Sequence, residues 1–324
     1  MTTPTTGVPS ADAAPAGAEP AESATVRSLM ASATRSLGSA AEGRWILAHA
    51  LGVPATELVT HLDDDASARL DDVRHMVDRR RGGEPLQYVL GTWAFRTLEL
   101  SVDRRVLVPR PETEQVVEVA LDELRRLAPG IHPGDTLVAA DLGSGSGAIA
   151  LSLAAEWSAG PGTPDLEVWA TDVSGDALDV LHANLASVSA DRADVARRVR
   201  TAPGSWFGAL PARLAGGLHL VVSNPPYVSA QEWESLDPEV RDHEPRSALV
   251  PGPTGFEAVE EILGEARRWL APGGVVVLEL APDQASSALQ AARELGYVGA
   301  VARRDLAGRL RMVVVRQPGH PPRR

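Results

Sequence analysis

Asn224, Pro225, Pro226 and Tyr227 form a tetrapeptide that could hold a planar nitrogen. They follow an apolar run, residues 218–222, after a single serine, and ligands of open α/β sheets bind beyond the carboxyl ends of such strands. An amide or aryl-amine nitrogen is a poor nucleophile because its lone pair is delocalised, so acceptors must orient its N–H groups. The Asn224 side-chain oxygen and the Pro225 carbonyl are two such acceptors, and the Tyr227 ring can pack against a planar group or a cation. The tetrapeptide therefore indicates methyl transfer to an amide or amino nitrogen, with Asn224, Pro225 and Tyr227 as catalytic residues; a turn without function is the alternative.

A glycine-rich turn forms the second group of residues suited to chemistry. It lies between an apolar run and a helical stretch and consists of Gly143, Ser144, Gly145, Ser146 and Gly147. Glycines there let the backbone turn tightly and approach a ligand closely. Asp172 ends the next apolar run, where a carboxylate can accept both hydrogen bonds from a ribose diol. The order of these signals predicts a site for a cofactor that contains a nucleoside.

Two cofactors fit the turn. Gly143, Gly145 and Ala148 also satisfy the G-x-G-x-x-A pattern of dinucleotide sites. Asp141 precedes the glycines, however, and a carboxylate there would repel a pyrophosphate but suits the cationic end of S-adenosylmethionine. Together with the tetrapeptide, this favours S-adenosylmethionine, with S-adenosylhomocysteine as the product. Trp206 is placed to stack on the adenine, although a core tryptophan explains it equally well.

The elements that must position these residues follow an alternating rhythm. Four apolar runs are predicted to be buried strands, and helical stretches separate them; the strands are residues 137–140, 166–170, 218–222 and 275–280, and the helices 148–157, 177–185 and 256–270. This alternation predicts an α/β fold with a parallel sheet covered on both faces. Two neighbouring strands without a helix between them, 297–302 and 311–316, end the chain. The layout is typical of a Rossmann-like class I methyltransferase sheet with an antiparallel terminal hairpin.

The first part of the chain has a different character. Residues 1–24 are rich in Ala, Pro, Thr and Gly and predict a disordered tail. Apolar residues then recur at helical spacing up to residue 81, which predicts a small all-α domain over residues 25–90. Residues 87–102 are predicted to form a β-hairpin, so residues 91–108 are assigned as a β-hairpin linker and 109–318 as the catalytic domain.

Composition excludes several kinds of site. The chain has 324 residues, which suggests about two domains, and it contains no cysteine, so disulfides and thiolate metal sites are absent. The histidines show no metal-ligand spacing, and no metal is predicted. A net charge of −12 disfavours electrostatic binding of nucleic acid. No apolar run is long enough to cross a bilayer, so we expect a cytoplasmic protein.

Taken together, these motifs resemble the peptide chain release factor N(5)-glutamine methyltransferase family. The resemblance covers residues 45–317 and includes segments 81–91 and 108–114, the glycine turn, Asp172, the tetrapeptide and residues 244–255. It implies methylation of the glutamine in the Gly-Gly-Gln loop of class 1 release factors by a two-domain protein whose N-terminal domain helps to dock the release factor. We expect the protein to be a monomer. It also implies that residues 143–147, Asp172, Trp206 and Asn224 contact S-adenosylmethionine and that residues 224–227, Pro226 included, hold the glutamine. The chain departs from the family pattern before Trp206 and at residues 280–284.

Other functions share part of this pattern. A glutamine methyltransferase that acts on a ribosomal protein would carry the same tetrapeptide, and the segments before residue 114 favour the release factor instead. An adenine-specific nucleic-acid methyltransferase would need a basic recognition region, which the acidic charge disfavours. A non-catalytic S-adenosylmethionine-binding module would not need an intact tetrapeptide. Arg110 and Glu112 fit either the active site or a brace at the domain junction.

Overall fold

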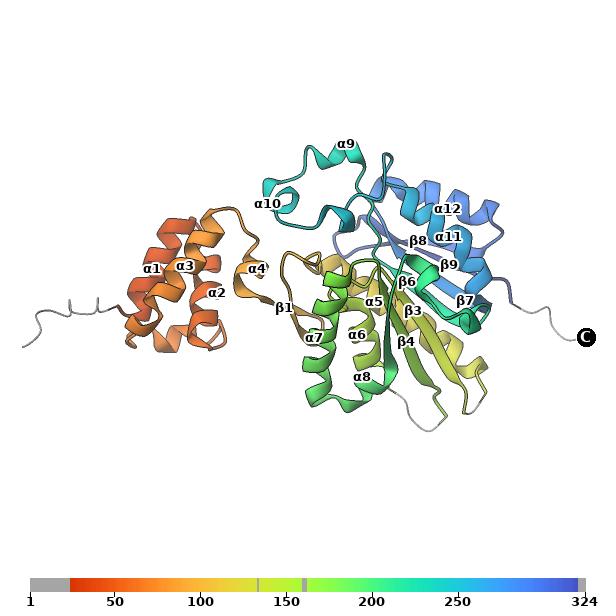
Figure 1. Ribbon diagram of the computed structural model, residues 1–324, viewed down its shortest axis with the longest axis horizontal. Coiled ribbons are helices and arrows are strands. Elements are labelled where there is room, and N and C mark those ends of the chain that lie inside the picture. Colours follow the sequence, from red (N-terminus) through yellow and green to blue (C-terminus); the bar gives the residue numbers. More distant parts are fainter. Residues whose placement is uncertain (1–23, 133, 159–161, 320–324) are drawn as a thin grey trace, which may run out of the picture. The chain divides into compact units, whose positions relative to one another are not determined.

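The computed structural model describes residues 24–319 except residues 133 and 159–161 (Figure 1). These residues divide between Gly82 and Gly83 into two compact units. The predicted disordered tail lies outside the described residues except for Ala24, which is buried and donates its N–H to the Ser67 hydroxyl. No helix within the described ranges is long and apolar enough to cross a membrane.

The first unit is helical, as the periodicity predicts. Its α-helices are α1 (Val26–Leu37), α2 (Ala40–Leu51) and α3 (Leu70–Arg81), with short 3-10 helices at Leu58–His61 and Ser67–Arg69. Thr25 and Ser39 cap the first two helices by accepting a backbone N–H. Leu29, Ile46 and Leu47 are buried between these helices.

One local prediction is wrong: residues 87–90 are not extended. They belong to α4 (Leu86–Leu90), in which the Tyr88 and Val89 amides donate to the Pro85 carbonyl and which ends at Gly91 with φ of 75°. Pro85 suits the start of a helix and a glycine with positive φ suits its end, and this outweighs the β-propensity of Tyr88 and Val89. The hairpin itself is present and pairs β1 (Thr92–Phe95) with β2 (Leu98–Ser101).

The second unit is built on a sheet of seven strands in the order β5-β4-β3-β6-β7-β9-β8. Neighbours from β5 to β7 are parallel, whereas β9 pairs antiparallel with both β7 and β8. The bounds are β3 (Thr136–Leu142), β4 (Asp165–Asp172), β5 (Val199–Pro203), β6 (Leu218–Ser223), β7 (Leu270–Glu279), β8 (Val298–Arg304) and β9 (Leu310–Arg316). The predicted fold class is confirmed. The short edge strand β5 was not predicted because Arg200 and Thr201 interrupt its apolar pattern.

Helices cover both faces of this sheet, and side chains alternate between them along each strand. Val275 and Val277 pack with α5 (Pro111–Leu127), α6 (Ala148–Glu156), α7 (Gly175–Asp191) and α8 (Ala193–Arg198). Val276 and Leu278 face α11 (Glu257–Trp269) and α12 (Ala285–Glu294) on the other side (Figure 1). A long connection between β6 and α11 carries the short helices α9 (Ala230–Trp233) and α10 (Pro238–Arg241).

The strand order reverses between β3 and β6. The chain runs outward from β3 through β4 to β5 and then returns to the other side of β3. Loops at the carboxyl ends of β3 and β6 therefore lead away in opposite directions and leave a crevice. Both predicted motifs, the glycine turn and the tetrapeptide, follow these two strands.

Candidate active site

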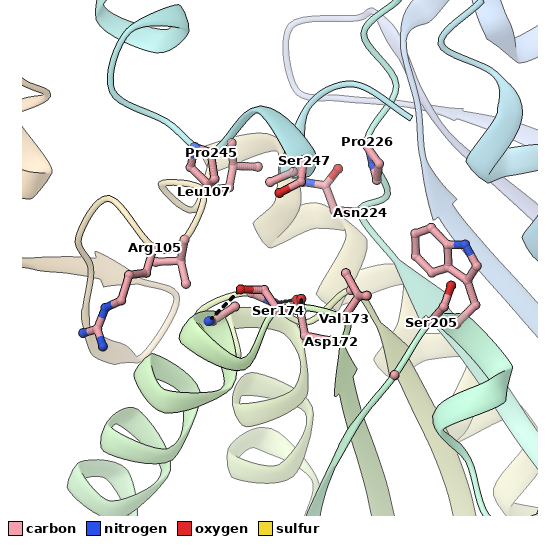
Figure 2. A pocket seen from close by; sticks show the side chains of 17 residues that line it. Arg105, Leu107, Asp172, Val173, Ser174, Ser205, Asn224, Pro226, Pro245 and Ser247 are labelled. Atoms are coloured by element: carbon pink, nitrogen blue, oxygen red, sulfur yellow. Dashed lines mark hydrogen bonds between the residues drawn. The ribbon is translucent and has the colours of Figure 1, made fainter. Parts of the chain in front are cut away.

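A cavity of about 190 Å³ lies at this carboxyl edge, and residues of the second unit alone line it. Gly143, Gly145, Asp172, Trp206 and Asn224, all predicted to bind the cofactor, line the cavity together with Pro226. Figure 2 shows Asp172 and Ser174 on one side and Asn224, Pro245 and Ser247 opposite them. Residues far apart in the sequence are thus brought to one site.

The glycine turn owes its shape to backbone conformations that other residues rarely adopt. Gly143, Gly145 and Gly147 have φ of 72°, 54° and 84°. A Cβ on Gly147 would lie 3.0 Å from Leu181, so this glycine serves packing. Ser144 and Ser146 are buried and do not line the cavity. Gly143 and Gly145 therefore line the cavity, whereas the other three predicted residues do not line it and instead maintain the conformation of the turn.

Asp172 connects the end of β4 to the glycine turn. Its Oδ2 accepts the Gly145 N–H at 2.9 Å, and its Oδ1 accepts the Ser174 N–H at 2.9 Å. A carboxylate has about four acceptor positions, so two remain for hydroxyl groups of a ligand. This arrangement fits a ribose diol, and it is also held rigidly before any ligand arrives.

Asp141 lies elsewhere than its position in the sequence suggests. Its side chain is fully buried and does not line the cavity, and its Oδ2 accepts the Ala150 N–H at 3.0 Å. Burial raises the pKa of this carboxyl to about 7. The expectation that this carboxylate faces the cationic end of the cofactor is therefore wrong, because the side chain turns inward to the first turn of α6.

Trp206 both lines the cavity and packs on the core. It has φ of 40°, which is unusual for a residue other than glycine. A Cβ on Gly143 would lie 3.4 Å from the Trp206 ring, so the ring lies against the glycine turn. The preceding Gly204 is in a tight turn, where a Cβ would lie 3.0 Å from that of Ala209. The ring is therefore held beside the first glycine by a backbone conformation that stores strain.

The tetrapeptide begins where β6 ends. Asn224 and Pro226 line the cavity, Pro225 is buried, and Tyr227 lies next to the cavity without lining it. Burial raises the pKa of Tyr227 to about 12, so its ring is neutral. The predicted residues are thus adjacent in space, with Asn224 the one whose polar group faces the cavity region (Figure 2).

Two residues without a predicted role hold Asn224. The Asn224 Nδ2 donates to the Thr113 Oγ1 at 3.2 Å, and the Thr113 hydroxyl donates to the Glu279 Oε2 at 2.7 Å. Burial raises the pKa of Glu279 to about 7. Two signals were present in the sequence: a charged residue inside the apolar run of residues 275–280, and the place of Thr113 within segment 108–114, which carries the family resemblance.

The backbone of the tetrapeptide is also held from the other side. Gln284 donates from its Nε2 to the carbonyl of Tyr227 at 3.0 Å and to that of Gly255 at 2.9 Å. Gly255 has φ of 80°, and a Cβ there would lie 2.7 Å from the Tyr227 carbonyl oxygen. Glycine is therefore required at this close approach of two chain segments.

Arg110 and Glu112 form ion pairs and do not line the cavity. The Arg110 Nη2 lies 2.6 Å from the Glu244 Oε1, and the Glu112 Oε1 lies 2.6 Å from the Arg309 Nη2. All four residues belong to the second unit. Glu244 precedes Pro245, which lines the cavity, so Arg110 fixes the segment that covers the site.

This fold and site define a class I methyltransferase. Among solved structures, the chain resembles the catalytic domain of human Mettl16 bound to an RNA hairpin, with 12% identity, a TM-score of 0.50, and 78% of this chain and 82% of that chain covered. A likeness at this level concerns the fold, and methyltransferases of this class use S-adenosylmethionine in general.

The sequence comparisons give the family. Residues 28–91 match the PrmC N-terminal domain family. The release factor glutamine methyltransferase of Gloeobacter violaceus is 42% identical over 73% of this chain and 76% of its own, and that of Burkholderia pseudomallei is 37% identical over 86% and 93%. The chain belongs to the release factor glutamine methyltransferase family.

Proposed function

We propose that this enzyme transfers a methyl group from S-adenosylmethionine to the side-chain amide nitrogen of the glutamine in the Gly-Gly-Gln motif of class 1 release factors. The observation that carries the proposal is the position of Asn224, whose side chain lines one end of the cavity while Asp172 and the glycine turn line the other. Membership of the family and the identity to its members over most of their length support a protein glutamine as the acceptor.

The residues of the cavity fit the cofactor. Asp172 retains acceptor positions for a ribose diol, Gly143 and Gly145 let the backbone approach closely, and Trp206 offers a ring for the adenine. S-adenosylmethionine, when bound, supplies an electrophilic methyl group. The contribution of this chain is to bind and orient, because an amide nitrogen needs alignment more than it needs a base.

Asn224 orients the target amide. Its Nδ2 is engaged by Thr113, so its Oδ1 is available to accept an N–H of the glutamine. The Pro225 carbonyl offers a second acceptor, and the ring of Tyr227 packs beside the planar amide. Holding the reacting atoms in line at about 3–3.5 Å can lower the barrier by several kcal/mol. The nitrogen becomes acidic as it gains the methyl group, so its proton leaves without a strong base.

The other parts of the chain have supporting roles in this proposal. Residues 25–90 help to dock the release factor, residues 91–108 link them to the catalytic domain at 109–318, and the enzyme acts as a monomer in the cytoplasm. A docking role for the helical region can be distinguished from a purely stabilising role. Only if the region docks the release factor should substitutions on its surface raise the KM for the release factor.

The test is a methyl-transfer assay with labelled S-adenosylmethionine and three separate acceptors: a purified class 1 release factor, ribosomal proteins and DNA. We expect label on the glutamine of the Gly-Gly-Gln motif, located by mass spectrometry, and none on a release factor with that glutamine replaced by asparagine. Asn224→Ala should abolish transfer while cofactor binding, measured by calorimetry, largely survives. Label on a ribosomal protein or DNA, and not on the release factor, would overturn the proposal.

A further inference from the structure

We propose that Thr113 and Glu279 are positioning residues of the methyl-transfer site, which fix the side-chain amide of Asn224 with its oxygen toward the target nitrogen. The inference rests on the proposed function and names the residues that orient its key acceptor. Neither residue lines the cavity, so both act through Asn224.

The topology brings the three residues together at one edge of the sheet. Ser223 and Leu278 are register partners on the parallel strands β6 and β7, so Asn224 and Glu279 come next at the carboxyl edge. Thr113 lies in the first turn of α5, which packs against both strands. Two hydrogen bonds, of 3.2 Å and 2.7 Å, then connect Asn224 through Thr113 to Glu279. Glu279, which lies 166 positions from Thr113 in the sequence, thus acts on Asn224 through the Thr113 hydroxyl.

Donor and acceptor counting gives this chain of hydrogen bonds a direction. An ionised carboxylate only accepts, so the single hydroxyl hydrogen of Thr113 must go to Glu279. The Thr113 oxygen can then only accept from Asn224, which must present its NH2 group. The Asn224 oxygen is thereby left for the substrate. A reversed amide would aim N–H groups at a nitrogen that itself carries N–H groups, and no hydrogen bond could form.

The charge on Glu279 decides this direction. Glu279 is 1% exposed, and burial raises its pKa to about 7. The charged groups that act on it are Arg110, Glu112 and Arg311, and the neutral Tyr227 lies beside it. When Glu279 is protonated it can donate to Thr113, whose hydrogen is then free to turn toward Asn224 and stabilise the reversed amide. Activity should therefore rise as Glu279 loses its proton.

The experiment separates the hydroxyl of Thr113 from its bulk. Thr113→Val keeps the shape and removes the hydroxyl, whereas Thr113→Ser keeps the hydroxyl. Ser152→Ala is the matched control, since Ser152 is a fully buried hydroxyl on α6 that does not contact Asn224. We expect Thr113→Val to lower kcat about tenfold, the loss of one hydrogen bond, with the Kd for S-adenosylmethionine unchanged. Thr113→Ser and Ser152→Ala should stay within about twofold of wild type.

Two further readouts distinguish positioning from a general structural role. The acid limb of the kcat profile near pH 7 should disappear in Thr113→Val, because Asn224 is then uncoupled from Glu279. The side-chain amide resonances of Asn224, assigned by their loss in Asn224→Ala, should shift in Thr113→Val and in Glu279→Gln but not in Ser152→Ala. This NMR measurement needs no substrate, so it tests the inference even if the wild-type enzyme fails to methylate a release factor. Unmoved resonances, or equal kcat values for Thr113→Val and wild type, would overturn it.

Discussion

Replacing Gly255 with alanine should place a methyl group against the backbone of the Asn-Pro-Pro-Tyr tetrapeptide. The new Cβ would lie 2.7 Å from the Tyr227 carbonyl oxygen and 2.8 Å from the Ser229 nitrogen. An ordinary contact is at least 3.4 Å, so the carbonyl must move by about 0.7 Å. A misplacement of about 1 Å can cost on the order of 100-fold in rate, so we expect kcat to fall between about tenfold and 100-fold.

The same substitution should also lower stability through two separate effects. Positive φ costs an alanine about 1–2 kcal/mol, and the overlap adds about 1–3 kcal/mol. Gly308→Ala isolates the first effect, because Gly308 has φ of 81°, close to the 80° of Gly255, and nothing lies within 4 Å of its added Cβ. Urea denaturation gives the free energy of unfolding of both variants, and label transfer to the release factor gives kcat. Equal losses of stability, together with wild-type kcat in Gly255→Ala, would refute the reasoning.

Three further substitutions test other contacts of the site. Arg110→Met leaves the buried carboxyl of Glu244 without its ion-pair partner and should lower the free energy of unfolding by about 2–3 kcal/mol in urea denaturation. Arg125→Met, which removes two exposed ion pairs, should cost less than about 0.5 kcal/mol. Similar losses in the two variants would contradict a stabilising role for the pair of Arg110 with Glu244. Burial raises the pKa of Asp141 from 3.8 to about 7, so the stability it contributes is complete below pH 3.8 and is lost as the pH rises toward 7. Asp141→Asn should therefore become more stable relative to wild type as the pH rises over this range, by at most about 1.4 kcal/mol per pH unit. If the unfolding free energies of the two proteins change with pH in parallel, the buried Asp141 carboxyl does not have this effect. Asp172→Ala should weaken S-adenosylmethionine binding about tenfold or more in calorimetry, since two hydrogen bonds to a charged group are lost; an unchanged Kd would mean that the ribose does not bind there.

The fold could be predicted from the sequence because its signals are local. Each buried strand of the parallel sheet is a short apolar run, and the run that becomes β3 leads directly into glycines with positive φ. Where two local signals conflict, as at Tyr88 and Val89, the helix start at Pro85 and the helix end at Gly91 prevail over β-propensity. Edge strand β5 escapes prediction because only its first residue, Val199, is buried, so its sequence needs no continuous apolar pattern.

The candidate site was predictable only in part. Asp172, Trp206 and Asn224 follow strands, and their positions beyond the sheet edge could be expected from topology. The direction in which a side chain turns could not: Asp141 points inward to Ala150 although it adjoins the glycine turn. The role of Thr113 could not be assigned either: segment 108–114 carries the family resemblance, but the hydrogen-bond partners of Thr113 lie 111 and 166 residues away in the sequence.

Every residue that lines the cavity belongs to the second unit, from Arg105 to Ala248. The residues that line the cavity, and the supports Thr113, Glu279 and Gln284, therefore all lie outside residues 24–82. In such a chain, the sequence of the first unit can change during evolution while the residues of the second unit that carry out the reaction stay the same. The same separation recommends the enzyme for engineering: chimeras that exchange the segment before Gly83 among relatives keep all of the residues around the cavity from a single parent.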